Sequence, residues 1–228
     1  MAESYITEQT QRTTLHHPAR LSALAMLAIV GQLFLLASAW LLPLVSEYTL
    51  VGDNISELVL GQYGFVQTLA FLIAGVGIIG LAYAIRRLTV GTWGSLTGAL
   101  LIGAHGVGAL LVALFPTDRI DTPADVLAQS TTGMIHSLVA LGSFVCVVVG
   151  MVVLAWTFSR AGRWRDITPW AALLATGGVS LLLGQIVTPS SPWVGLLQRM
   201  FVTVIAGWMI LVAFRVRALA TAAEAAQR

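Results

Sequence analysis

The sequence predicts an all-α fold: a polytopic membrane protein built as a bundle of six transmembrane helices, with both termini cytoplasmic. Three observations lead to this prediction: the composition, six long apolar stretches and the uneven distribution of arginine. Of the 228 residues, 57% are hydrophobic and only 10% are charged, and the mean hydropathy is +0.88. A soluble domain carries about 25% charged residues. The composition therefore excludes a water-soluble enzyme and an intrinsically disordered chain.

Six stretches are long enough to cross the hydrocarbon core of a bilayer, which takes about 20 mostly apolar residues. The first stretch ends at Pro43. The fifth opens on Thr168 and Pro169, a pattern typical of an N-cap followed by proline at the first helical position. The sixth opens in the same way on Ser191 and Pro192. The predicted spans are 21–43, 64–85, 94–115, 134–157, 170–188 and 194–214.

The arginines predict the orientation, because cytoplasmic loops are enriched in basic residues. All 12 basic side chains are arginine. With six spans, both termini share one side with the loops 86–93 and 158–168, and the opposite side carries only Arg119 and Arg199. The basic isoelectric point near 9.1 thus reflects topology, and we expect lipid and membrane protein subunits, not nucleic acid, as partners. The arginines on the side of the termini are Arg12, Arg20, Arg86, Arg87, Arg160, Arg163, Arg165, Arg215, Arg217 and Arg228.

Three segments describe the predicted organisation: a polar cytoplasmic tail over 1–20, the six-helix domain over 21–214 and a helical cytoplasmic tail over 215–228. Two of the predicted outer loops are long enough to hold a short helix. Asn54 with Glu57 resembles a capping box in the first of these loops. Thr122 and Asp125 form the same pattern around a proline in the second.

Polar side chains gather in the predicted outer halves of the helices, below the acidic loops. Because polar groups within a membrane are costly and tend to mark functional sites, this asymmetry predicts a polar pocket that opens outward. The residues concerned are Gln62, Gln67, His136, Gln185, Gln198 and Arg199.

Arg199 is the most specific element of this pocket. An arginine within a membrane needs a partner or a water-filled vestibule. Glu57 and Asp118 stand at the outer ends of neighbouring spans and are its candidate partners. The alternative is that Arg199 extends to the phosphate headgroups of the lipid.

The two histidines of the spans have different expected roles. His136, at the outer interface, is either a proton-transfer group or metal ligand beside Asp118, or a solvated side chain. His105, near mid-membrane, is a candidate single axial ligand for a haem or pigment. A haem held by both histidines is excluded, because helical rise separates their depths by roughly 12–15 Å. No other cofactor is indicated, and the single cysteine, Cys146, excludes a cysteine metal cluster.

Four short motifs resemble a known family, catalogued as domain of unknown function 998, whose members are six-helix prokaryotic membrane proteins without an assigned activity. The motifs are ISEL at 55–58, FPTD at 115–118, GMIH at 133–136 and GLLQR at 195–199. The resemblance covers about residues 20–215 and implies a prokaryotic plasma membrane. It also implies that one outer site contains Ser56, Glu57, Asp118, His136 and Arg199. Gln198 departs from the pattern, in which a glutamate precedes the arginine.

Three functions are compatible with these features. The first is a non-enzymatic ligand-binding or accessory subunit of a membrane complex, with Arg199, Ser56, Gln185 and Gln198 as ligand-binding candidates. The second is a membrane-embedded enzyme acting on a lipid or small molecule at the outer leaflet, with Asp118, His136 and Glu57 as candidate catalytic residues. The third is a small transporter, against which stands the absence of an internal repeat. We favour the first.

Overall fold

The computed structural model describes residues 17–227 apart from 90, 121 and 190, so most of the predicted tail over 1–20 lies outside the described residues. Within the described part of the chain every regular element is helical. Six helices are long and apolar enough to cross a membrane, which confirms the all-α six-helix fold. They are α2 (Pro18–Leu41), α3 (Gly64–Leu88), α4 (Trp93–Leu114), α6 (Thr131–Arg160), α7 (Thr168–Val187) and α8 (Val194–Ala225).

Short helices occupy the segments between these spans: η1 (Leu42–Val45), η2 (Ile55–Leu60), α5 (Pro123–Leu127) and η3 (Gly162–Trp164). The Asp125 carboxylate accepts from the backbone N–H of Thr122 at 2.7 Å, as a capping box requires. The Asn54 cap differs from the expectation. Its amide donates to the Glu57 carboxylate at 2.9 Å, and the Asn54 side chain does not cap the helix.

The two proline-containing helix starts also differ from the prediction. Helix α7 already includes Thr168, whose hydroxyl donates to the carbonyl of Trp164 at 2.9 Å and so does not cap the helix. Helix α8 begins at Val194, and Ser191 instead forms a turn in which its backbone N–H donates to the carbonyl of Thr188 at 3.1 Å. The proline of this segment therefore lies in the turn before the helix.

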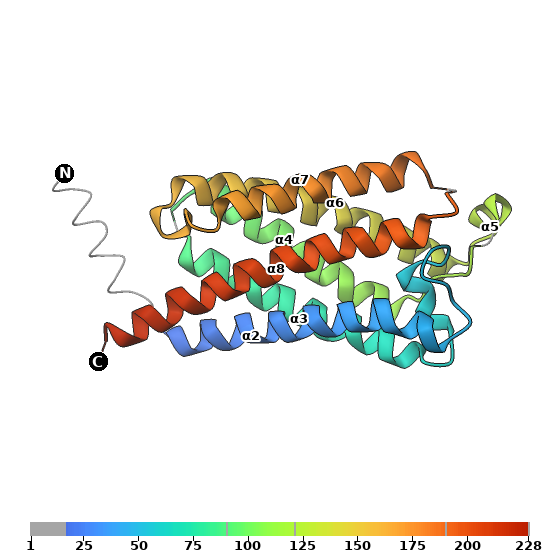
Figure 1. Cartoon of the computed structure of the whole chain (residues 1–228), viewed down its shortest axis with the longest axis horizontal. Helices are drawn as coiled ribbons and strands as arrows, with labels where there is room; N and C mark the ends of the chain where they lie inside the picture. The colour runs from blue at the N-terminus through green and yellow to red at the C-terminus, as the bar shows by residue number, and fades with distance from the viewer. Residues whose placement is uncertain (1–16, 90, 121, 190, 228) are drawn as a thin grey trace.

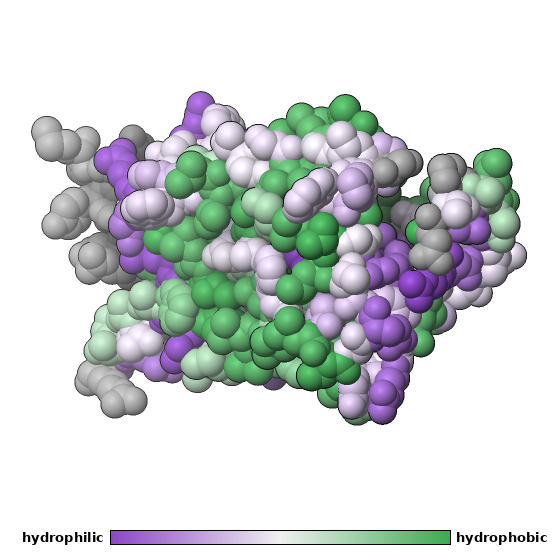
Figure 2. Space-filling view, turned by 45° about the vertical axis from the view of Figure 1, so that its right-hand side comes forward, coloured by the Kyte–Doolittle hydropathy of each residue, from purple (hydrophilic) through white to green (hydrophobic). Residues whose placement is uncertain are grey.

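The six long helices form a closed ring. Each helix packs mainly against its neighbours in the order α2, α3, α4, α6, α7 and α8, and α8 packs back against α2. Figure 1 shows the helices running along the long axis of the molecule. We call the end with segments 42–63, 115–130 and 188–193 the loop end, and the end with 89–92 and 161–167 the terminal end. A hydrophobic band separates hydrophilic residues at the two ends (Figure 2), as a membrane-spanning bundle requires.

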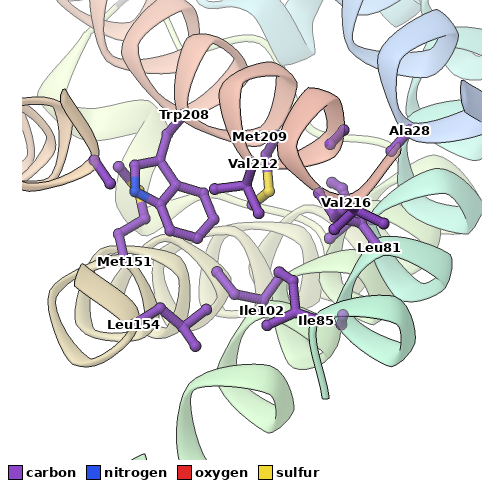
Figure 3. Packing of buried hydrophobic residues seen from close by; sticks show 14 of the residues in the cluster. Ala28, Leu81, Ile85, Ile102, Met151, Leu154, Trp208, Met209, Val212 and Val216 are labelled. Carbon is purple, nitrogen blue, oxygen red and sulfur yellow. The ribbon is translucent and has the colours of Figure 1, made fainter. Parts of the chain in front are cut away.

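Large side chains fill the ring toward the terminal end. The rings of Phe158 and Trp164 stack with centroids 4.3 Å apart, and the Trp208 ring stacks on Phe158 at 6.3 Å. Met151 and Ile102 close the remaining space beside Trp208 (Figure 3), and all five side chains are buried. Buried aromatic and aliphatic side chains therefore pack the interior of this half of the bundle.

Helices α2 and α3 approach each other closely through small residues. A Cβ atom built on Gly77 would lie 2.8 Å from the Cα atom of Ala28, closer than real Cβ contacts. Where lipid provides no hydrophobic drive for association, such small residues allow backbones to pack tightly.

We expect the Gly77→Leu substitution to force α2 and α3 apart and to destabilise the fold by roughly 1–3 kcal/mol, the usual cost of overpacking. Thermal unfolding in detergent, followed by tryptophan fluorescence, measures this effect. Gly142→Leu is the matched control, because nothing lies within 4 Å of a Cβ at Gly142. Equal loss of stability in both variants would contradict the close approach.

Candidate functional site

A cavity with a volume of about 70 Å³ lies inside the ring at the loop end. Helices α2, α3, α4, α6 and α8 form its walls, η2 closes one side, and α7 contributes no lining residue. The volume corresponds to roughly five water molecules, at about 10–15 Å³ for each. Most lining side chains are apolar. The polar lining residues are Gln32, Ser56, His105, His136, Ser143 and Gln198.

Two residues that line the cavity each have a buried polar atom without a hydrogen-bond partner: the Nε2 atom of Gln32 and the Nδ1 atom of His105. Their side chains are only 1% and 9% exposed. A buried polar group without a partner is costly. Gln67, one turn from Phe71 on the same face of α3, is also buried and leaves both amide atoms unpartnered.

His136 lies at the wall of the cavity but is held by the backbone. Its Nδ1 atom is 2.7 Å from the carbonyl oxygen of Phe115. Since a carbonyl only accepts hydrogen bonds, Nδ1 carries the proton. Asp118 acts electrostatically on the ring, while its own carboxylate accepts from the backbone N–H and the hydroxyl of Ser130, at 2.6 and 3.0 Å. Asp118 thus orders the start of α6.

Arg199 is fully buried five residues into α8, and its hydrogen bonds go to backbone carbonyls. The Nε atom donates to the carbonyl of Ala39 at 2.9 Å. The Nη1 atom donates to the carbonyls of Leu50, Asp53 and Gly195, at 3.1, 2.6 and 3.1 Å. The guanidinium therefore joins the end of α2 and the loop after it to the start of α8.

Two further bonds fix the same loop on α8. The backbone N–H of Leu196 donates to the carbonyl of Val51 at 3.1 Å. The side-chain oxygen of Gln198 accepts from the backbone N–H of Ile55 at 2.6 Å. Because Ile55 and Ser56 both line the cavity, these bonds position η2 as its cover.

Asp53 links the loop that carries η2 to the loop that follows α4, which contains Arg119. Its carboxylate accepts from the backbone N–H of Thr49 at 2.6 Å and lies 4.0 Å from the Arg119 guanidinium. The same guanidinium lies 5.4 Å from the ring centroid of Tyr48. Burial raises the pKa of the Tyr48 phenol above its ordinary value of 10.0, so this side chain is neutral at physiological pH.

The structure brings together part of the predicted site. Ser56, Gln198, His136 and His105 line one cavity. In the described part of the chain, no hydrogen bond joins Arg199 to Asp118 or His136. The acidic groups that act on the Arg199 charge are Asp53 and Glu57.

Other candidate residues have different environments. Glu57 is buried against Asn54. Gln185 projects from α7, which does not line the cavity, and its amide donates to the carbonyl of Leu181 at 3.4 Å. Gln32 and Ser143 line the cavity and were missed by the sequence analysis. The sequence did contain a signal for Gln32, because it is a lone amide side chain within the apolar first span.

The metal and haem hypotheses remain predictions. Among the described residues, no group of three His, Cys, Asp or Glu side chains is arranged to hold a metal ion. His105 lines the cavity, but the free volume of about 70 Å³ is much smaller than a porphyrin.

We expect Arg199→Lys to loosen the loop end, because one ammonium group cannot reach carbonyls on three segments. Stability should fall by about 3 kcal/mol or more, since each hydrogen bond to a charged group contributes roughly 1.5–3 kcal/mol. Hydrogen–deuterium exchange should increase over residues 46–60. Arg165→Lys is the control, because Arg165 is exposed at the terminal end. Unchanged exchange over 46–60 would show that Arg199 does not hold this loop.

Comparison with known proteins gives one match. No curated protein and no solved structure matches the chain. A family model described as "Protein of unknown function (DUF998)" matches residues 26–215, which include all of the lining residues of the cavity. The chain belongs to the DUF998 family of proteins of unknown function.

Proposed function

We propose that this protein is a non-enzymatic ligand-binding membrane protein, which holds a small, mainly apolar molecule inside its helical ring. The observation that carries the proposal is the cavity at the loop end, whose lining is mainly apolar with six polar residues among it. Ligand sites are typically concave and mostly apolar, with few polar groups that fix orientation. This cavity has that composition.

The contrast between the two halves of the ring supports the proposal. Trp208 and Phe158 fill the interior toward the terminal end. At the loop end, Ala74, Ala109 and Ala140 line the cavity where larger side chains would close it. Since membrane bundles are stabilised mainly by packing, a void lined by alanine lowers stability, and binding an occupant would offset this loss.

A second candidate function is an enzyme acting on the bound molecule. His136 favours it, because the ring lies at the cavity wall with Nδ1 held by the carbonyl of Phe115. A fixed histidine of this kind can transfer a proton. Chemical conversion of the bound molecule, abolished by His136→Phe, would establish this function in place of simple binding.

The orientation is part of the proposal: the terminal end faces the cytoplasm of a prokaryotic cell and the cavity lies toward the outer leaflet. The arginines of the predicted cytoplasmic loops support it. A fluorescent protein fused after Arg228 should fluoresce in a bacterial host, while alkaline phosphatase fused there should be inactive. Alkaline phosphatase fused after Ala128 should be active, and the reverse pattern would overturn the orientation.

We expect Ala109→Phe to block the cavity, because Ala109 lines it. Protein purified from native membranes should carry a co-purifying small molecule, detected by mass spectrometry of extracts, and this variant should lose it at least 5-fold. Ala104→Phe is the matched control on the same helix, since Ala104 is exposed. Thermal unfolding verifies that both variants fold. Identical extracts from all three proteins would contradict the proposed function.

A further inference from the structure

We propose that the outer surface of the ring carries a binding site for an anionic phospholipid, with the headgroup at Arg160 and one acyl chain in a groove between α6 and α7. This site is separate from the cavity inside the ring, so it goes beyond the proposed function. Three observations carry it: the composition of the groove, the geometry of Arg160 on Trp156, and the position of both on one face of α6.

The groove lies where α6 and α7 run side by side (Figure 1). It has a volume of about 350 Å³ and is lined only by aliphatic side chains. It faces outward, because Val149, Val152 and Leu183 are 44%, 46% and 55% exposed. In a bilayer, a hydrocarbon chain lying along it supplies the packing contacts that the two helices do not make with each other. The lining residues are Val145, Val148, Val149, Val152, Val179, Leu182, Leu183 and Ile186.

Helix α7 leaves this side of the ring open. It is the least buried of the six spans. A Cβ atom built on Gly184 would have no neighbour within 4 Å, and at Gly178 the nearest atom would lie 3.6 Å away. Ala172 and Thr176 continue the same face of α7 toward the terminal end, and both are exposed. Only small side chains of this face therefore lie between the groove and the terminal end.

Arg160 has the geometry of a headgroup ligand. Its guanidinium carbon lies 4.0 Å from the centroid of the Trp156 ring. Stacking of this kind uses the flat face of the guanidinium and leaves its N–H groups, which lie in the plane, directed outward. Within the described part of the chain, these N–H groups have no hydrogen bond or ion pair. They can bind two oxygens of one phosphate, the geometry in which arginine binds phosphate most strongly.

The headgroup position and the groove share one face of α6. Val145, Val149, Val152 and Trp156 follow one another at spacings of four, three and four residues, which places them on the same side of the helix. At 1.5 Å per residue, Val152 lies roughly 12 Å and Val145 roughly 22 Å from Arg160 along the axis. One leaflet of hydrocarbon is about 15 Å thick. A phosphate at Arg160 thus places the start of the chain beside Trp156 and its remainder in the groove.

The charges around Arg160 favour a lipid with a net negative charge. Arg163 and Arg165 follow in the next loop, and the acidic residue of that loop, Asp166, is paired with Arg215 at 3.0 Å. A choline or ethanolamine headgroup would bring a cation among these arginines. Phosphatidylglycerol carries the same phosphate without a cation, so basic residues near a membrane surface attract it.

The test uses the full-length protein in phosphatidylcholine nanodiscs that contain a trace of phosphatidylglycerol with a diazirine in its acyl chain. After irradiation, peptide mass spectrometry locates the labelled residues. We expect labelling to concentrate within 145–152 and 176–186. Unlabelled phosphatidylglycerol should displace this labelling roughly 5-fold more strongly than phosphatidylethanolamine at the same mole fraction.

Two variants separate a specific contact from the general charge of this end. Arg160→Gln should lower labelling of the groove roughly 5-fold, the effect expected of one arginine near a membrane surface. Arg87→Gln is the matched control, because Arg87 is exposed at the same end but on α3. It removes the same charge and should leave labelling of the groove unchanged.

Three results would overturn the proposal. The first is labelling spread evenly over the lipid-facing residues of all spans, or equal displacement by the two unlabelled lipids. The second is equal loss of labelling in both arginine variants, which would assign the effect to the general charge of the terminal end. The third is a groove without label in a protein of dimeric mass, which would assign the groove to a second copy of the chain. The cavity inside the ring plays no part in this test, so the proposed function is tested separately.

Discussion

The loop end of this protein depends on one buried guanidinium. Arg199 has no exposure, and its bonds to the carbonyls of Ala39, Leu50, Asp53 and Gly195 join three segments of the chain. Burying a charge is costly unless dipoles or opposite charges replace the lost hydration. Ala39 lies in the last turn of α2, so the arginine also donates to a carbonyl near the end of that helix. The Arg199 bonds also position η2 over the cavity, because η2 begins two residues after Asp53, whose carbonyl accepts from Arg199.

The ring then divides into a filled half and a hollow half. Stacked aromatic side chains around Trp208 fix the helices at the terminal end, and glycines such as Gly77 bring α2 against α3. A ring held at one end by its core and at the other by the Arg199 bonds can retain a cavity without collapsing. Gln32 and His105, which line that cavity, each have a buried polar atom without a partner.

The sequence predicts the fold well, because crossing a membrane imposes length and composition on each helix. It also predicts Ser56, His136 and Gln198 near one another, since all three belong to the same end of the bundle. It does not predict the partners of Arg199. Carboxylates are visible in a sequence as candidate partners, whereas backbone carbonyls belong to every residue and are selected only by the path of the loop. The starts of α7 and α8 differ because proline is compatible with both the first helical turn and the turn before it.

Several polar residues of this site form hydrogen bonds to the backbone of the protein itself. Arg199 and Gln198 bond to the backbone of the loop and stabilise the cover. His136 bonds to the backbone of Phe115 and stabilises the start of α6 against the end of α4. These groups were the conspicuous ones in the sequence, and the bonds named here stay within the protein, although the Nη2 atom of Arg199 is buried without a partner. The conspicuous polar residues of the sequence therefore serve mainly to hold the loop end together.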